Sequence, residues 1–154
     1  MMNSFRGSNI IVLFLLFFVF HCTHQWCLNS QLNQNGAVKT IDYAPDNKYM
    51  LTVSVTAKAV YFWNIITKTL DLTYANYTAS SPVSAKFSKN TSYVIIGYSD
   101  GNIHILNGVF PFAYISDFQS GITALIEIDV GWDSDRLLVC GGNFVKVYNL
   151  TTTI

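Results

Sequence analysis

Short apolar runs separated by polar turns recur along the chain from residue 38 onward. The clearest unit is Tyr93–Asn107, which reads YVIIGYSDGNIHILN. Its two apolar runs flank a turn in which Gly101 supplies positive φ and Asp100 supplies local side-chain hydrogen bonding. This pattern predicts a β-hairpin, and fainter copies of it stand before and after it in the sequence.

These copies return at a regular spacing. The strand-ending pairs are Trp63-Asn64, Leu106-Asn107 and Tyr148-Asn149, about 43 residues apart. A cycle of about 40–45 residues with four strands is typical of β-propeller blades, whereas a β-sandwich does not need the cycle to repeat. We therefore predict an all-β fold, a partial β-propeller of about three four-stranded antiparallel blades over residues 38–78, 82–118 and 122–154.

Within each cycle the apolar runs predict individual strands, and the polar stretches predict the turns between them. Besides the hairpin, the predicted strands are Val38–Tyr43, Tyr49–Ser54, Ala59–Asn64, Thr69–Tyr74, Val83–Phe87, Phe112–Phe118, Arg136–Cys140 and Phe144–Asn149, with a third cycle that begins at Ile122. The turns over residues 44–48, 88–92 and 131–135 take equivalent places in the cycle. We expect them to line up on one face, where rigid strands would hold them.

The copies also share a motif: hydrophobic-x-x-hydrophobic-x-aromatic, a polar turn, a strand, an Asp-containing turn, and a strand that ends in an aromatic-polar pair. The residues that carry it in the first copy are Val38, Ile41, Tyr43, the turn Ala44-Pro45-Asp46-Asn47 and Phe62-Trp63-Asn64. In the second copy they are Ala85, Phe87, Asp100 and Leu106-Asn107, and in the third Val145, Val147 and Tyr148-Asn149. In this motif residues 38–64, 82–107 and 122–149 resemble WD-repeat β-propeller blades. Asn replaces Asp in every terminal pair, and Asp100 alone stands at the place of the family's turn aspartate. The resemblance implies a scaffold that binds protein partners through its turns.

Three copies are fewer than a closed ring needs. Propellers usually close with about four to eight blades, which protects the edges of their strands. We therefore expect either that this chain is a piece of a longer propeller or that self-association completes the ring.

The N-terminus has a different pattern. Ile10–Phe20 reads IIVLFLLFFVF and follows a polar stretch that carries Arg6. As a helix this run rises about 16 Å, roughly half of a bilayer core of about 30 Å. A short cationic region followed by such a run is typical of a secretory signal peptide, which we assign to residues 1–26 with a linker over 27–37. An uncleaved signal-anchor and a buried segment or misassigned start codon are the alternatives.

This assignment predicts a secreted or lumenal protein. A membrane-anchored protein is the alternative if Ile10–Phe20 is not cleaved, and a cytoplasmic location is less favoured. The secretory pathway would also give meaning to three N-glycosylation sequons, at Asn76, Asn90 and Asn149. Of these, Asn76 and Asn90 fall in predicted exposed turns.

Composition narrows the range of partners. Charged residues make up only 12% of the chain and its formal net charge is zero, so there is no basic surface for nucleic acid. Three cysteines do not make a disulfide framework. Cys27 and Cys140 could form a bridge in an oxidising compartment, but two unrelated thiols are the favoured interpretation.

The candidate chemistry is sparse, and it predicts no catalytic, cofactor or metal site. His104 alternates with Ile103 and Ile105 on a strand, so we interpret it as solvent-facing or hydrogen-bonded within the fold. The acidic pairs Glu127/Asp129 and Asp133/Asp135 fit a solvated strand face and a turn better than paired catalytic carboxylates or a Ca²⁺ loop.

The aromatic residues suggest where a partner could bind. Trp63 ends a strand and is expected in the core between blades, whereas Trp132 lies in a turn and is the candidate binding contact. We expect a non-catalytic scaffold for protein–protein contacts in the secretory pathway, with no cofactor. The alternative is a lumenal or membrane-tethered propeller fragment of an enzyme, such as a hydrolase or a quinoprotein-like oxidoreductase, whose site lies in missing blades.

Overall fold

The computed structural model describes residues 31–75 and 80–150, and all of its regular structure is β. Eleven strands form three antiparallel sheets, and these residues contain no α-helix. The prediction of an all-β fold built from antiparallel sheets is therefore confirmed. The predicted signal peptide and its hydrophobic helix lie outside the described residues. Within the described ranges no helix is long and apolar enough to cross a membrane.

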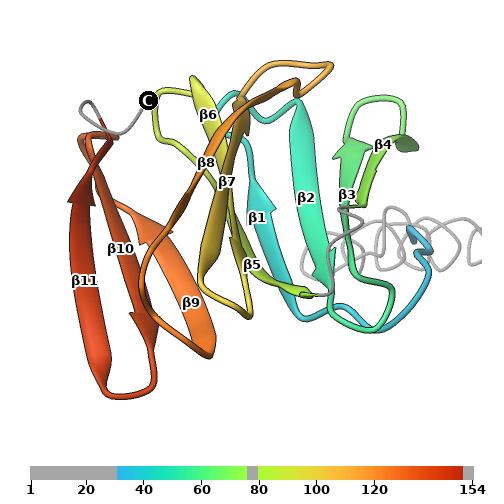
Figure 1. Ribbon diagram of the computed structural model, residues 1–154. Helices are drawn as coiled ribbons and strands as arrows, with labels where there is room; N and C mark the ends of the chain where they lie inside the picture. Colours follow the sequence, from blue (N-terminus) through green and yellow to red (C-terminus); the bar gives the residue numbers. More distant parts are fainter. Residues whose placement is uncertain (1–30, 76–79, 151–154) are drawn as a thin grey trace, which may run out of the picture. The chain divides into compact units, whose positions relative to one another are not determined.

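Each sheet is a meander in which sequence neighbours pair (Figure 1). Sheet A contains β1 Thr40–Tyr43, β2 Tyr49–Ser54, β3 Ala59–Asn64 and β4 Thr69–Ala75. Sheet B contains β5 Pro82–Phe87, β6 Tyr93–Tyr98, β7 Asn102–Asn107 and β8 Tyr114–Gln119. Sheet C contains β9 Leu125–Val130, β10 Arg136–Gly141 and β11 Phe144–Asn149. Residues 151–154, where a fourth strand of sheet C was predicted to begin, lie outside the described ranges.

Three predicted strand starts differ from the observed ones by two residues or more, and the other boundaries agree within one residue. β1 begins at Thr40 rather than at Val38. β9 begins at Leu125 rather than at Ile122, because residues 120–124 form the connection from sheet B. β8 begins at Tyr114 rather than at Phe112. Phe112 has a φ of 56°, which a strand does not accommodate, and its ring is buried against sheets A and B.

The sheets pack face to face, and the first strand of each contacts the first strand of the next. One apolar cluster joins sheets A and B; it includes Leu51, Val53, Val60, Phe62, Phe87, Val94, Ile96, Leu106 and Phe112. A second cluster joins sheets B and C; it includes Val83, Ile95, Ile103, Ile105, Leu125, Ile128, Val130, Leu137 and Val139. Sheet B is therefore apolar on both faces, which explains the continuous run of buried residues in β6.

The remaining face of sheet A has a cluster of its own. Met50, Ala59, Tyr61 and Trp63 form it, with Leu32 packed against them. The prediction that Trp63 lies between blades is wrong: Phe62 faces sheet B, and the neighbouring residue of a strand must face the other way. The Tyr61 hydroxyl donates to the Asn35 carbonyl at 3.1 Å, so part of the predicted linker packs on this face.

Candidate binding surface

Three turns of nearly identical backbone occupy one end of the sheets. In each, the N–H of the fourth residue donates to the carbonyl of the first: Asn47 to Ala44, Thr91 to Ser88, and Ser134 to Gly131, at 2.9, 3.0 and 2.9 Å. The fourth residue has a positive φ in every copy, at 58°, 59° and 62°. The sequence repeat is thus also a repeat of backbone geometry.

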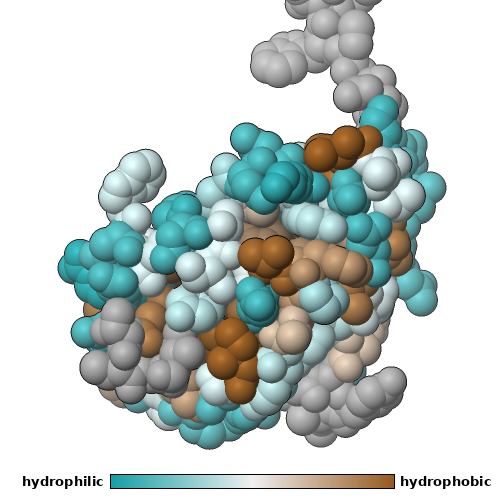
Figure 2. Space-filling view, turned by 90° about the horizontal axis from the view of Figure 1, so that it is seen from above, coloured by the Kyte–Doolittle hydropathy of each residue, from teal (hydrophilic) through white to brown (hydrophobic). Residues whose placement is uncertain are grey.

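The three turns come together around an open hollow of about 520 Å³. Its lining includes Tyr43, Pro45, Asn47, Lys89, Asn90 and Trp132. Figure 2 looks onto this end of the sheets, where hydrophobic groups stand among polar ones. Hydrogen bonds across the sheets fix the turns, since the Asn90 N–H donates to Ser134 Oγ at 3.0 Å and the Phe87 N–H to Asp42 Oδ2 at 2.8 Å.

Two aromatic side chains stand open to solvent at this hollow. Trp132, chosen from the sequence as a binding contact, is 90% exposed, and Tyr43 is 55% exposed. A fully solvated indole makes almost no packing contribution to the fold. Indole and phenol rings carry a large apolar area with a polar tip, and they are enriched where proteins bind proteins.

The charges at the hollow favour an acidic contact. Arg136 forms an ion pair with Asp133, and this hydrogen bond holds the pKa of the Asp133 carboxyl below its usual range. Asp133 is therefore ionised but neutralised locally. Lys89 is exposed and has no ion pair among the described residues. Its ammonium group is the charge that a partner would meet.

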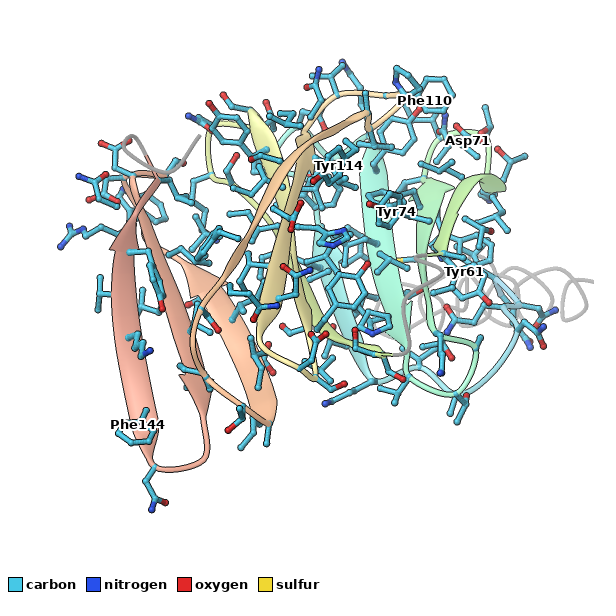
Figure 3. All side chains as sticks on the ribbon, viewed as in Figure 1. Tyr61, Asp71, Tyr74, Phe110, Tyr114 and Phe144 are labelled. Carbon is cyan, nitrogen blue, oxygen red and sulfur yellow. The ribbon has the colours of Figure 1, made fainter. Side chains whose placement is uncertain are left out.

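A second polar cluster lies between sheets A and B, around His104. His104 is 7% exposed, so it is buried and hydrogen-bonded rather than solvent-facing. Its Nδ1 lies 3.1 Å from the Tyr74 hydroxyl of β4, and its ring meets Tyr98 and Tyr114 at centroid distances of 4.6 and 5.7 Å. Figure 3 shows Tyr74 and Tyr114 on the outer strands of their sheets.

Burial governs the ionisation of this cluster. It lowers the pKa of His104, and the charges of Asp117 and Asp100 oppose that shift in part. Burial also raises the pKa of Tyr74, and a hydrogen bond to Asp117 raises that of Tyr114. At neutral pH the cluster therefore holds a neutral imidazole among neutral phenols. It provides contacts between sheets A and B and lies away from the hollow.

Other residues singled out from the sequence have structural roles. Gly101 has a φ of 87°, and the Asp100 carboxylate accepts from the Asn102 N–H at 3.1 Å, which gives the hairpin its turn. Glu127 accepts a hydrogen bond from Ser84 of sheet B. Cys140 is a half-buried free thiol, while Cys27 lies outside the described residues.

Two of the three predicted glycosylation sequons lie within the described residues. Asn90 and Asn149 are exposed, and Asn76 lies outside the described residues. The Asn90 side chain accepts hydrogen bonds from the Ser88 hydroxyl and the Ser92 N–H, at 2.8 and 3.0 Å. Asn90 therefore shapes its turn as well as lining the hollow.

Sequence reasoning singled out Trp132 at the hollow but missed Tyr43, Pro45, Asn47 and Lys89. The signal was available, because each of these residues lies in or beside one of the three turns expected to align. What the sequence did not provide was the distance between the turns, which depends on how the sheets pack.

Comparison with known proteins adds no family. A scan of the sequence against protein-family models and a search of curated proteins both found no match. Within residues 31–75 and 80–150, no group of three or more His, Cys, Asp or Glu side chains is placed to hold a metal ion.

Proposed function

We propose that this chain is a non-catalytic scaffold for protein–protein contacts, and that its sheets are WD-repeat-like blades of a partial β-propeller. The observation that carries the proposal is the convergence of three equivalent turns around one hollow. Rigid strands hold these turns, and the side chains of Trp132 and Tyr43 are largely exposed beside the hollow.

Several features support the architecture. Each sheet is a four- or three-stranded antiparallel meander, and first strands lie next to first strands. The turn hydrogen bonds recur at the same spacing as the sequence motif. These are the features expected of propeller blades, whose loops at one end commonly bind partners.

The hollow favours a particular kind of partner surface. Trp132 and Tyr43 offer apolar area, and Lys89 offers a cation that has no ion pair among the described residues. We propose that the partner presents a polypeptide segment with an aromatic or aliphatic side chain and a nearby carboxylate. We place this chain in the secretory pathway, because Ile10–Phe20 has the pattern of a signal peptide.

Photo-crosslinking tests this function. A photoreactive aromatic amino acid replaces Trp132 in the tagged full chain, which is produced in the cells from which the protein comes. The matched control places the same amino acid at Phe144, an exposed aromatic of the same sheet at its opposite end (Figure 3). We expect defined protein partners to crosslink from position 132 and not from position 144.

Charge reversal makes the test specific. Lys89→Glu should remove the crosslinks formed from position 132, because it places a carboxylate against the partner's acidic group. The proposal fails if both positions capture the same proteins, or if capture from position 132 is indifferent to the charge at Lys89.

A further inference from the structure

Three residue pairs in the sequence are prone to rearrange through a cyclic imide. In each, glycine follows asparagine or aspartate, so no side chain on the second residue hinders attack by its nitrogen on the preceding side-chain carbonyl. They are Asn35-Gly36, Asp100-Gly101 and Asn107-Gly108. The glycine nitrogen must lose its proton and turn towards that carbonyl. Hydrogen bonding of the glycine N–H therefore decides which pair reacts.

The fold holds two of these pairs in place. The Gly101 N–H donates to a carbonyl of its own turn at 2.9 Å, and the Gly108 N–H donates to the Ser92 carbonyl, also at 2.9 Å. The side chain before Gly108 is fixed as well, because Asn107 Oδ1 accepts from the Val109 N–H at 3.2 Å. Cyclisation at either pair must first break these hydrogen bonds.

The pair Asn35-Gly36 is open. Both residues are exposed, and the Asn35 carboxamide and the Gly36 N–H have no hydrogen-bond partner among the residues that the structure describes. The backbone carbonyl of Asn35 accepts from the Tyr61 hydroxyl at 3.1 Å, and this bond leaves the Gly36 nitrogen free. Attack by this nitrogen therefore breaks no hydrogen bond.

We propose that Asn35-Gly36 is a site of spontaneous deamidation, and that the Tyr61 hydroxyl favours the reaction. When the Gly36 nitrogen gives its proton to water, negative charge spreads onto the Asn35 carbonyl oxygen, where the Tyr61 hydroxyl stabilises it. The nitrogen forms a bond to Asn35 Cγ, the Cγ–Nδ2 bond breaks, and ammonia leaves with a proton returned by water. Water then opens the imide at one of its two carbonyls, which leaves isoaspartate or aspartate at position 35.

The product changes the segment that lies on the outer face of sheet A. The Thr52 hydroxyl accepts from Trp63 Nε1 at 3.0 Å and donates to Gln34 Oε1, so this segment is connected to the buried indole. Gly36 packs closely, since an added Cβ would lie 2.5 Å from Ser54 Oγ. Isoaspartate lengthens the main chain by one methylene and adds a charge between these two contacts. The modified segment then uncovers Trp63, which is 4% exposed in the unmodified chain.

Deamidation is measured on the full-length chain, which is incubated at mildly alkaline pH and then cut into peptides for mass spectrometry. An isoaspartyl methyltransferase labels the isoaspartate. We expect Asn35 to react about tenfold or more faster than Asn107, because two hydrogen bonds must be broken at Asn107. In urea both pairs lose their contacts, so the two rates should become similar. Tyr61→Phe should slow the reaction at Asn35 about threefold or more and leave Asn107 unchanged.

Equal rates at the two pairs in the native chain, or a faster reaction at Asn107, would overturn the proposal. An unchanged rate at Asn35 in Tyr61→Phe would overturn the part assigned to the hydroxyl. These rates do not depend on the hollow, so this proposal and the scaffold function can fail separately.

Acrylamide quenching measures the effect on sheet A. In a chain with Trp26→Phe and Trp132→Phe, Trp63 is the remaining tryptophan. Quenching should rise after incubation, whereas the same chain with Asn35→Gln should keep Trp63 protected, because glutamine cyclises far more slowly. Equal quenching in the two incubated chains would show that deamidation does not uncover Trp63.

Discussion

Acid should weaken the packing between sheets A and B through His104. The imidazole is buried between the two sheets, and Tyr74 of sheet A lies at its Nδ1. Burial lowers its pKa, and the charges of Asp117 and Asp100 reverse only part of that shift. Protonation is therefore less favourable in the folded protein than in the unfolded chain.

The sign and size of the effect follow from proton linkage. Above the ordinary His pKa of 6.5 both states are neutral, and His104 adds no pH dependence. Below it the unfolded chain binds the extra proton, so stability falls as the pH falls towards the lowered folded pKa. The limiting slope is about 1.4 kcal/mol per pH unit, and the loss levels off once the pH lies below the lowered folded pKa.

Urea unfolding at several pH values between about 7.5 and 5 measures this loss. His104→Gln is the comparison, because glutamine keeps hydrogen-bonding groups at the site and does not titrate. The variant should have a lower stability at neutral pH but a flatter dependence on pH below 6.5. The lowered pKa of Asp133 keeps that carboxylate ionised through this range.

His21 and His24, which lie outside the described residues, are present in both proteins and cancel in the difference. The reasoning is refuted if the two proteins lose stability equally between pH 6.5 and 5. It is also refuted if the wild-type protein loses none, because a buried neutral imidazole must respond to acid.

Three further outcomes are expected. Phe112→Ala should lower the free energy of unfolding by about 3–5 kcal/mol in urea titrations, because the Phe112 ring stacks on Phe62 in the core with 4.3 Å between ring centroids. Phe144 is exposed, so Phe144→Ala should lower the free energy of unfolding by less than about 1 kcal/mol. Gly101→Ala should lower the free energy of unfolding by about 2 kcal/mol or more in the same assay, because the added Cβ would lie 2.1 Å from the Ile122 carbonyl oxygen. Gly142→Ala, also at positive φ, should lower it less, because its Cβ would meet nothing within 4 Å. In protein from the secretory pathway, Asn90→Gln should remove a glycosidase-sensitive shift in gel mobility. The glycosylated form should give fewer crosslinks from position 132, because a glycan on Asn90 would occupy the hollow. Equal crosslinking from both forms would contradict this prediction.

The strands could be predicted from the sequence because their cause is local. Apolar runs such as Tyr93–Tyr98 are bounded by turns whose residues suit positive φ or side-chain capping. The presence of each strand and its approximate ends therefore follow from residues close to it in the sequence. Phe112 is the exception. It continues an apolar pattern and was assigned to a strand, but its ring is drawn into the core from a turn by four aromatic neighbours.

Which face a residue occupies could not be predicted where both faces are buried. Alternation places Trp63 opposite Phe62, and His104 opposite Ile103, but it does not say which side meets another sheet. In a sheet with one solvated face, polarity would decide. Sheet B has no such face, so His104 could be buried as readily as exposed, and only the packing of Tyr74 over it settles its environment.

The three turns show where the repeat is strict and where it is not. Their backbones agree in hydrogen bonding and in the sign of φ, yet the residues are Ala-Pro-Asp-Asn-Lys, Ser-Lys-Asn-Thr-Ser and Gly-Trp-Asp-Ser-Asp. The backbone geometry of the turns sets how the first two strands of each sheet pair, so it must recur in every copy. The turn side chains are free of that requirement, and they differ at buried positions such as Ala44 and Ser88 as well as at exposed ones. Pro45, Lys89 and Trp132 therefore give the hollow a character that the repeat alone does not specify.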